Sequence, residues 1–382
     1  MIDYHSRTTA LGPRLRSKYR AWFLGWWVLD APDVVGKGSS KSGNWRHKGR
    51  KGQRGGSLPG AGHGAIGVMI GDTPERVDEQ IRRHKEAQAS AKEAKRARAK
   101  MLRDVAPIIK QISAAKARAA ALDKQRSELT TEHLMPLYDQ MQELRRAGQQ
   151  DSAEYAALQE QAKPYEAQKA QLFKGSSSEL NYAKNLQLEL RNKAVESLSV
   201  PEGQRANFNL DIQPGKDLED TVGVGAQVFS QLVGTGTMDG KTLKVVETNK
   251  SRASYNDGTK TASLTSYSKT ASVVHEMGHW WEDHDKQAFG KALAFWERRT
   301  KRESFQQLNK IFPHEGYPDH EVTKPDKFMD PYSGKVYTEA GKGITATEIL
   351  SVGLEKMYTH PVAFARNDPD YFDFMYSTLR GK

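Results

Sequence analysis

The sequence predicts an α+β domain over residues 199–382, preceded by a long α-helical region over residues 72–198 and a disordered basic arm over residues 1–71. Three observations support this division. The first part is rich in Gly, Ser, Arg and Trp, and the second is dense in Ala, Lys, Arg, Glu and Gln. The third contains short β-branched runs between turn residues. Such shifts in composition separate segments that fold differently.

The net charge of +11 comes entirely from the N-terminal half. Residues 1–200 hold 35 Lys and Arg against 22 Asp and Glu, whereas residues 201–382 hold 23 against 25. A basic arm on a near-neutral domain predicts a polyanionic partner, with nucleic acid as the candidate. A solvated linker and a proteolytic maturation site are the alternatives. The candidate polyanion-binding residues are Arg46, Lys48, Arg50, Lys51 and Arg54.

Two absences limit the classes of protein that the sequence allows. The chain has no cysteine, which excludes a disulfide scaffold, a cysteine-ligated metal site and a thiol nucleophile. Its longest apolar run, Ala21–Leu29, is far shorter than the ~20 residues that span a bilayer. We therefore expect a soluble protein without a transmembrane segment.

Helical signals begin where Thr73 precedes Pro74 and continue, with breaks, to Leu198. The segment Ile81–Ala119 has few large apolar residues, which predicts a solvated helix. Spaced leucines between Leu122 and Leu144 predict a packing stripe.

Later breaks in this region predict that the chain folds back on itself. Gly148 is the first break, and a second helix is expected over Ser152–Phe173, kinked at Pro164, before a turn at Gly175–Ser178. An α-helical hairpin or coiled coil that acts as a spacer or oligomerisation element follows from this pattern.

The C-terminal part contains one strong chemical motif. Two predicted strands, Thr242–Thr248 and Thr261–Thr265, precede an apolar helix that carries His275-Glu276-Met277-Gly278-His279. In this HExxH spacing, both imidazoles stand on one helical face and reach the same cation, while Glu276 faces the water that the cation polarises. The motif predicts a zinc site.

A catalytic zinc needs a third protein ligand, and the sequence offers several. Asp285, with His284 beside it, follows the second histidine by six residues, but Glu282 stands where a turn-forming glycine is expected. Glu348 lies in the first turn of a second apolar helix predicted over Ile344–Lys356. A buried carboxylate needs a partner such as a zinc ion, which favours Glu348.

HExxH followed by a helix that contains Glu-x-x-Ser, here Glu348 to Ser351, resembles the gluzincin metallopeptidases. The resemblance implies a zincin-like domain with zinc held by His275, His279 and Glu348. It also implies an aspartate four residues after Glu348, where this chain has Val352, so Ser351 or Glu355 would have to replace it.

The run Lys327–Gly381 resembles the zincin-like region of phage and prophage head or structural proteins, and Asn44–Gly60 is similar to a Gly/Arg-rich segment of phage head-morphogenesis proteins. This resemblance implies phage structural proteins as partners. It also implies a location in the cytoplasm of an infected or lysogenic bacterium, or in the virion.

The sequence thus predicts a zinc peptidase that hydrolyses a peptide or protein substrate with Glu276 as the general base. The strand Thr261–Thr265, through Ala262, Ser263 and Leu264, is expected to pair with an extended substrate. The alternative is a phage structural or nucleic-acid-binding protein with a non-catalytic zincin-like domain. The candidate oxyanion donors are Tyr255, Tyr332, Tyr337 and His360.

Overall fold

A computed structural model describes residues 74–213, 216–234, 236 and 238–381. The described residues belong to one compact unit, which spans residues 73–382. The predicted basic arm and its five polyanion-binding candidates lie outside the described residues. Within the described part, every helix is too short or too polar to cross a membrane.

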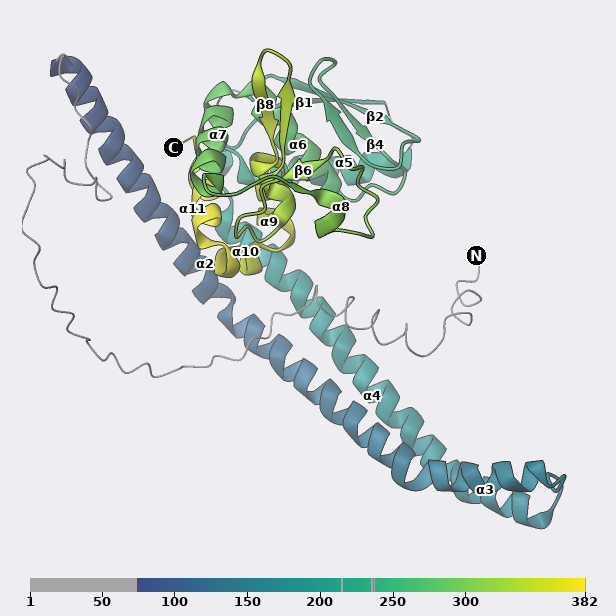
Figure 1. Ribbon diagram of the computed structural model, residues 1–382. Helices are drawn as coiled ribbons and strands as arrows, with labels where there is room; N and C mark the ends of the chain where they lie inside the picture. Colours follow the sequence, from purple (N-terminus) through teal and green to yellow (C-terminus); the bar gives the residue numbers. More distant parts are fainter. Residues whose placement is uncertain (1–73, 214–215, 235, 237, 382) are drawn as a thin grey trace, which may run out of the picture. The chain divides into compact units, whose positions relative to one another are not determined.

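The helical region is an antiparallel hairpin (Figure 1). Its elements are α2 (Pro74–Leu129), a π-helical turn (Thr130–Leu134), α3 (Met135–Arg146) and α4 (Ala153–Leu198). Gly148 adopts a left-handed conformation (φ 74°) after α3, and Ser152 caps α4 by accepting a hydrogen bond of 3.1 Å from the backbone N–H of Tyr155. The predicted break and the predicted start of the second helix are both confirmed.

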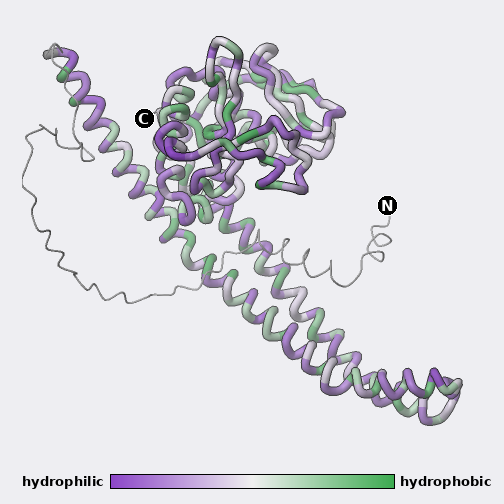
Figure 2. The backbone as a smooth tube through the Cα atoms, viewed as in Figure 1, coloured by the Kyte–Doolittle hydropathy of each residue, from purple (hydrophilic) through white to green (hydrophobic). Residues whose placement is uncertain are grey.

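The face of α2 that packs on α4 runs through the segment predicted to be solvated. Its buried residues, separated by steps of seven, four and three, are Ala94, Met101, Val105, Ile108, Ile112, Ala115 and Ala119. These positions follow the spacing of a coiled-coil seam, and Figure 2 shows apolar positions recurring along both long helices. The prediction of a solvated Ile81–Ala119 is therefore wrong, because alanine fills several seam positions that larger residues usually occupy.

Helix α4 is continuous through the turn predicted at Gly175–Ser178, so that prediction is also wrong. Pro164 lies inside the helix without ending it. A Cβ atom at Gly175 would lie 3.2 Å from Cδ1 of Leu122, and Ser176 is buried. The small residues thus let α4 approach α2 closely, and this packing outweighs their low helix propensity.

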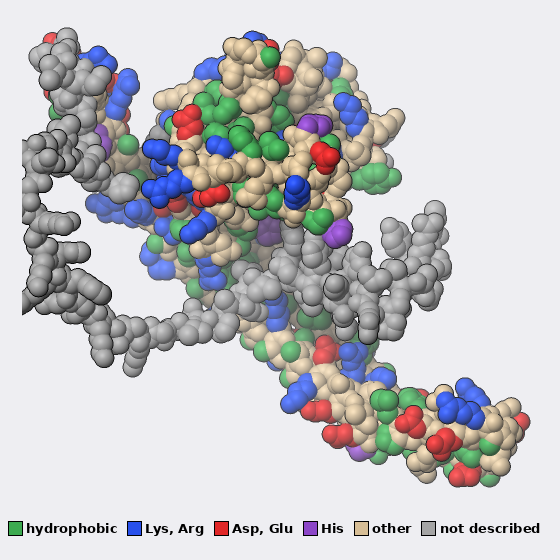
Figure 3. Space-filling view, in the orientation of Figure 1, with side chains coloured by type: hydrophobic (Ala, Val, Ile, Leu, Met, Phe, Trp, Pro, Cys, Tyr) green, Lys and Arg blue, Asp and Glu red, His purple; other side chains and the backbone are tan. Residues whose placement is uncertain are grey.

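The hairpin shares one hydrophobic core with the rest of the unit. Met101 and Leu198 belong to the same buried cluster as Trp280 and Phe372. Arg98 of α2 donates from Nε to Oδ1 of Asp373 over 2.8 Å. Figure 3 shows Lys and Arg side chains gathered beside α2, α7 and α11 on the face drawn. The base of the hairpin is therefore part of the C-terminal unit and not a detached spacer.

A four-stranded sheet follows the hairpin, in the order β1-β2-β4-β3. Its strands are β1 (Asn209–Gln213), β2 (Thr242–Glu247), β3 (Ser254–Asn256) and β4 (Thr261–Leu264). The first three in spatial order are parallel, whereas β3 runs antiparallel to β4 at the edge. The two predicted strands are confirmed as β2 and β4, and β4 is an internal strand.

The remaining helices lie against the sheet or against one another and build the rest of the core. They are α5 (Lys216–Leu232), α6 (Thr270–His284), α7 (Lys286–Thr300), α8 (Leu308–Ile311), α9 (Ile349–Thr359), α10 (Pro361–Asn367) and α11 (Pro369–Thr378). Small hairpins pair β5 (Gln306–Gln307) with β6 (Val322–Thr323), and β7 (Val336–Glu339) with β8 (Gly343–Thr347). Short 3₁₀ turns cover Glu202–Gln204 and Pro331–Gly334. The second half of the predicted helix Ile344–Lys356 is confirmed, but its start is strand β8.

Helices α6 and α9 pack against each other with almost no space between their backbones. A Cβ atom at Gly278 would lie 2.5 Å from Cα of Ser351 and 3.0 Å from its backbone nitrogen. Only a residue without a side chain allows this approach, because backbone atoms cannot move aside as a flexible side chain does. Gly278 therefore fixes the distance between the two helices.

We predict that Gly278→Ala lowers the free energy of unfolding by about 1–3 kcal/mol, as overpacking of a close helix contact does. Urea unfolding measures this change. The control is Gly290→Ala on α7, where an added Cβ meets no atom within 4 Å and where alanine should stabilise the helix by about 0.5–1 kcal/mol. Equal effects of the two substitutions would contradict the role given to Gly278.

Candidate metal centre

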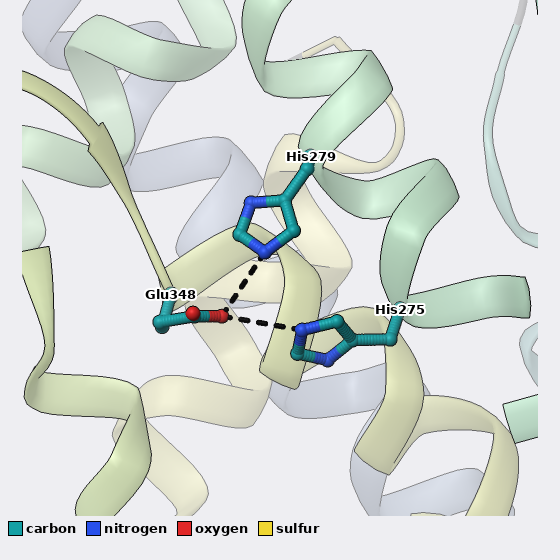
Figure 4. A group of neighbouring side chains, drawn as sticks. All are labelled: His275, His279 and Glu348. Carbon is teal, nitrogen blue, oxygen red and sulfur yellow. Dashed lines mark ion pairs between the residues drawn. The ribbon is translucent and has the colours of Figure 1, made fainter. Parts of the chain in front are cut away.

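Helix α6 places His275 and His279 one turn apart, with their ring centroids 5.1 Å from each other (Figure 4). Glu348 stands at the N-cap position of α9, directly after β8, and its carboxylate points at both rings. The prediction that Glu348 lies within the first helical turn is off by one position. The close packing of α6 on α9 brings these three side chains together. We call His275, His279 and Glu348 the metal group, or the cluster.

The distances within this group suit a tetrahedral metal ion. Oε2 of Glu348 lies 3.3 Å from Nε2 of His275 and 3.2 Å from Nε2 of His279. All three ligand atoms lie within 4.8 Å of one another. Metal–ligand bonds of about 2.0–2.1 Å in a tetrahedron separate neighbouring ligand atoms by roughly 3.3 Å. The three residues could therefore hold one ion and leave a fourth coordination position free.

Glu348 is held in place by two hydroxyl groups. Ser351 donates to Oε2 over 2.6 Å, and Tyr337 donates to Oε1 over 2.6 Å. The carboxylate is fully buried. Burial raises the pKa of Glu348, but the adjacent His279 and His275 outweigh this and hold its pKa well below the usual value. The group is thus an anion that is already oriented for a cation.

His275 is oriented by a second carboxylate. Its Nδ1 lies 3.1 Å from Oε2 of Glu355, which fixes the ring and leaves Nε2 facing Glu348. A carboxylate on the outer nitrogen of a ligand histidine selects its tautomer and raises its basicity. Lys356 Nζ lies 2.9 Å from Asp330 and 3.6 Å from Oε1 of Glu355, so the outer carboxylate is itself paired. Both residues proposed in place of Val352 therefore contact the group: Ser351 holds Glu348 and Glu355 holds His275.

The two histidines are basic in this environment. Burial alone would lower the pKa of each ring, but Glu348 and Glu355 raise the pKa of His275 well above its usual value. Against the same burial, Glu348 also raises the pKa of His279. Metal ligation requires both rings to be neutral, so an ion binding here would displace protons.

Glu276 is buried beside the cluster, with 5 % of its surface exposed. Burial raises the pKa of its carboxyl group, although His275 and His279 lower it. A carboxylate with a raised pKa accepts a proton from water more readily than an ordinary glutamate. Its burial and its raised pKa suit a general base.

Other predicted ligands do not reach this group. Asp285 caps α7 by accepting hydrogen bonds of 3.0 Å from the backbone N–H groups of Gln287 and Ala288. Nδ1 of His284 lies 3.0 Å from the carbonyl oxygen of Trp280. Helix α6 continues through Glu282, as the missing glycine indicated, and this carries both residues away from the metal group.

Two of the oxyanion candidates lie near Glu348. Tyr337 donates to it, and Tyr332, which accepts from Lys335 over 3.2 Å, is hydrogen-bonded to Tyr337. Tyr255 instead donates to Asp283 over 2.8 Å. His360 ends α9, about 18 Å along the helix axis from Glu348. His360 contacts the hydroxyl of Thr359 and senses the charge of Glu355 rather than that of Glu348, so its catalytic role stays a prediction.

The predicted substrate strand is also wrong. Ala262, Ser263 and Leu264 belong to β4, which is paired on one side with β2 and on the other with β3. Its backbone groups are therefore occupied, and an added strand would find no partner there. The open edge beside α6 belongs to β3 instead.

Glu282 also lies beside the metal group, although no role there was predicted for it from the sequence. It is 2 % exposed, and its carboxylate accepts hydrogen bonds from the backbone N–H and the hydroxyl of Thr347, the residue before Glu348. Burial raises its pKa to about 7. The available signal was its place four residues after Gly278, on the face of α6 that meets α9.

We predict that Glu348→Gln lowers zinc affinity by at least about 100-fold, because an amide oxygen replaces an anionic ligand. The matched control is Asp285→Asn, which retains an N-cap residue and should leave the affinity within about twofold. Competition with a chromogenic chelator measures both. A large loss with Asp285→Asn and none with Glu348→Gln would assign the third ligand to α7.

We also predict that Glu282→Gln changes the pH dependence of stability in chelator-treated protein. Since the folded pKa of about 7 exceeds the usual 4.5, the folded state binds the proton more tightly, and stability falls as the pH rises between these values. The fall is roughly 3 kcal/mol. The amide should remove it, as measured by urea unfolding at pH 5 and pH 8, whereas exposed Glu297→Gln should retain it.

Comparison with known proteins does not show a family for this chain. The chain matches no protein-family model, no curated protein and no solved structure. The HExxH motif, the position of Glu348 and the groups that orient them remain as the features that point to a function.

Proposed function

We propose that the protein is a zinc-dependent peptidase of the gluzincin type, with a zincin-like fold over residues 199–382. The observation that carries this proposal is the meeting of His275, His279 and Glu348 at ligand spacing beside the buried Glu276. Two imidazoles and one carboxylate suit zinc, and three protein ligands leave a position for water, as catalytic zinc sites do.

Zinc held there would act as a Lewis acid on a water molecule and on the carbonyl group of the scissile peptide bond. Glu276 would take a proton from the attacking water and deliver it to the leaving amine nitrogen. Glu355 would keep the ring of His275 in the ligating orientation, and Ser351 would do the same for Glu348. The free amine and the carboxylate product would then leave.

Tyr337 is the donor best placed to stabilise the oxyanion. Its hydroxyl lies beside Glu348, and its ring is edge-on to that of His279, with 6.1 Å between their centroids. Burial and the charge of Glu348 raise the pKa of this phenol, so it keeps its proton and remains a donor. Turning the hydroxyl from Glu348 toward the substrate would supply the hydrogen bond.

The substrate would be an extended peptide that adds to the edge strand β3. Beta-strand addition satisfies the backbone of a peptide while leaving its side chains to be read by neighbouring loops. This assigns the role first given to β4 to the strand next to it.

A second candidate function is a phage structural or nucleic-acid-binding protein whose zincin-like domain does not turn over. The excess of basic residues over residues 1–200 favours it. On either proposal the partners would be phage structural proteins and the location an infected or lysogenic bacterium, or the virion. Peptide hydrolysis separates the two candidates.

We predict that Glu276→Gln lowers the rate of peptide hydrolysis by a factor of about 100 or more while zinc remains bound, because Glu276 acts on water and not on the metal. Hydrolysis of unstructured casein is followed with zinc content measured by atomic spectroscopy on the same samples. Exposed Glu297→Gln is the matched control and should retain full activity. Unchanged turnover in Glu276→Gln would contradict the mechanism, and zinc-loaded wild type without turnover would favour the structural candidate.

A further inference from the structure

An exposed arginine lies just before the edge strand β3. Arg252 precedes the strand by two residues, and its side chain is 53 % exposed. Within the described chain β3 pairs only with β4, so a peptide could add along its other side. Arg252 would then face the side chains of that peptide.

The charge of Arg252 is only partly balanced by its neighbours. Its Nη2 lies 3.5 Å from Oε1 of Glu321, while the other oxygen of that carboxylate lies 2.7 Å from Nζ of the buried Lys335. One carboxylate therefore serves two cations, and the shorter pairing belongs to Lys335. The trio carries a net charge of +1, located on its exposed member.

Arg252 also lies near the reacting groups. Its guanidinium is 5.7 Å from the ring centroid of Tyr317. Lys335, which shares Glu321 with Arg252, has its Nζ 4.7 Å from the ring centroid of Tyr337. Tyr337 in turn donates to Glu348. A peptide positioned for attack near Glu348 would thus meet this cation.

We propose that Arg252 is the anion-binding residue of the substrate site and selects peptides that carry a carboxylate near the scissile bond. The guanidinium has five N–H donors in a planar fork, and Glu321 occupies only one side of it. Because Glu321 pairs more closely with Lys335, Arg252 keeps part of its positive charge unbalanced, and an incoming carboxylate would neutralise it. The carboxylate belongs either to an acidic side chain or to a free C-terminus, and this inference rests on the proposed peptidase function.

The test measures binding in a variant that does not turn over. Full-length, zinc-loaded Glu276→Gln protein is titrated into fluorescein-labelled heptapeptide pools of uncharged residues. Three amidated pools fix the central position as Glu, Gln or Lys, and a fourth fixes Gln and keeps a free C-terminus. Fluorescence anisotropy gives the affinity of each pool, and zinc content and thermal unfolding verify that each protein is folded.

We expect at least one carboxylate pool to bind about tenfold more tightly than the amidated Gln pool, and the Lys pool to bind most weakly. Adding Arg252→Gln should remove this preference, and Arg252→Lys should retain part of it because the charge remains without the fork. The matched control is Lys250→Gln, which removes an exposed positive charge two residues away and should leave the preference unchanged.

Equal binding of the Glu, free-terminus and Gln pools would overturn the proposal, as would a preference that survives Arg252→Gln. The pool that shows the Arg252-dependent preference identifies the source of the carboxylate. Failure of the peptidase function is visible separately, because wild-type protein would then hydrolyse none of the four pools.

Discussion

The contact between Gly278 and Ser351 sets the geometry on which the metal group depends. The two histidines belong to α6, and Glu348 belongs to the turn that starts α9, so ligand spacing requires the helices to lie at one fixed separation. A side chain at position 278 would collide with the backbone of α9. The glycine inside the HExxH motif thus sets the distance between the two helices, and the two histidines of the motif face Glu348 across that distance.

Burying so many charges at one place is costly unless each has a partner. Glu348 is balanced by two histidines, Glu355 by His275 and Lys356, and Lys356 by Asp330. The chain of contacts reaches from the cluster to the loop before β7. Replacing a charged residue of that loop would therefore change the electrostatic environment of His275 rather than the packing around it.

The local parts of this structure were predictable from sequence. The spacing of His275 and His279 follows from one helical turn. Glu348 was predictable as their partner because a carboxylate in an apolar segment is costly to bury alone. Pairing between distant segments was not predictable, since Thr261–Thr265 has the same composition whether it is an edge or a central strand. The seam of α2 was present in the spacing from Ala94 to Ala119, but alanine carries a weak hydropathy signal. The packing of Gly175 on Leu122 left no local signal at all.

The shared core begins only partway along the hairpin, so the far part of the hairpin extends beyond it. The part of α4 from Ala153 to Ala183 lies before the residues that join the common core, and at 1.5 Å per residue it extends for about 45 Å. A single polypeptide that touched both the far end of the hairpin and the shared core would need roughly 14 extended residues to bridge them. The hairpin would therefore hold a partner bound at its tip about 45 Å from the shared core, while a long unfolded tail of that partner could still reach the metal group.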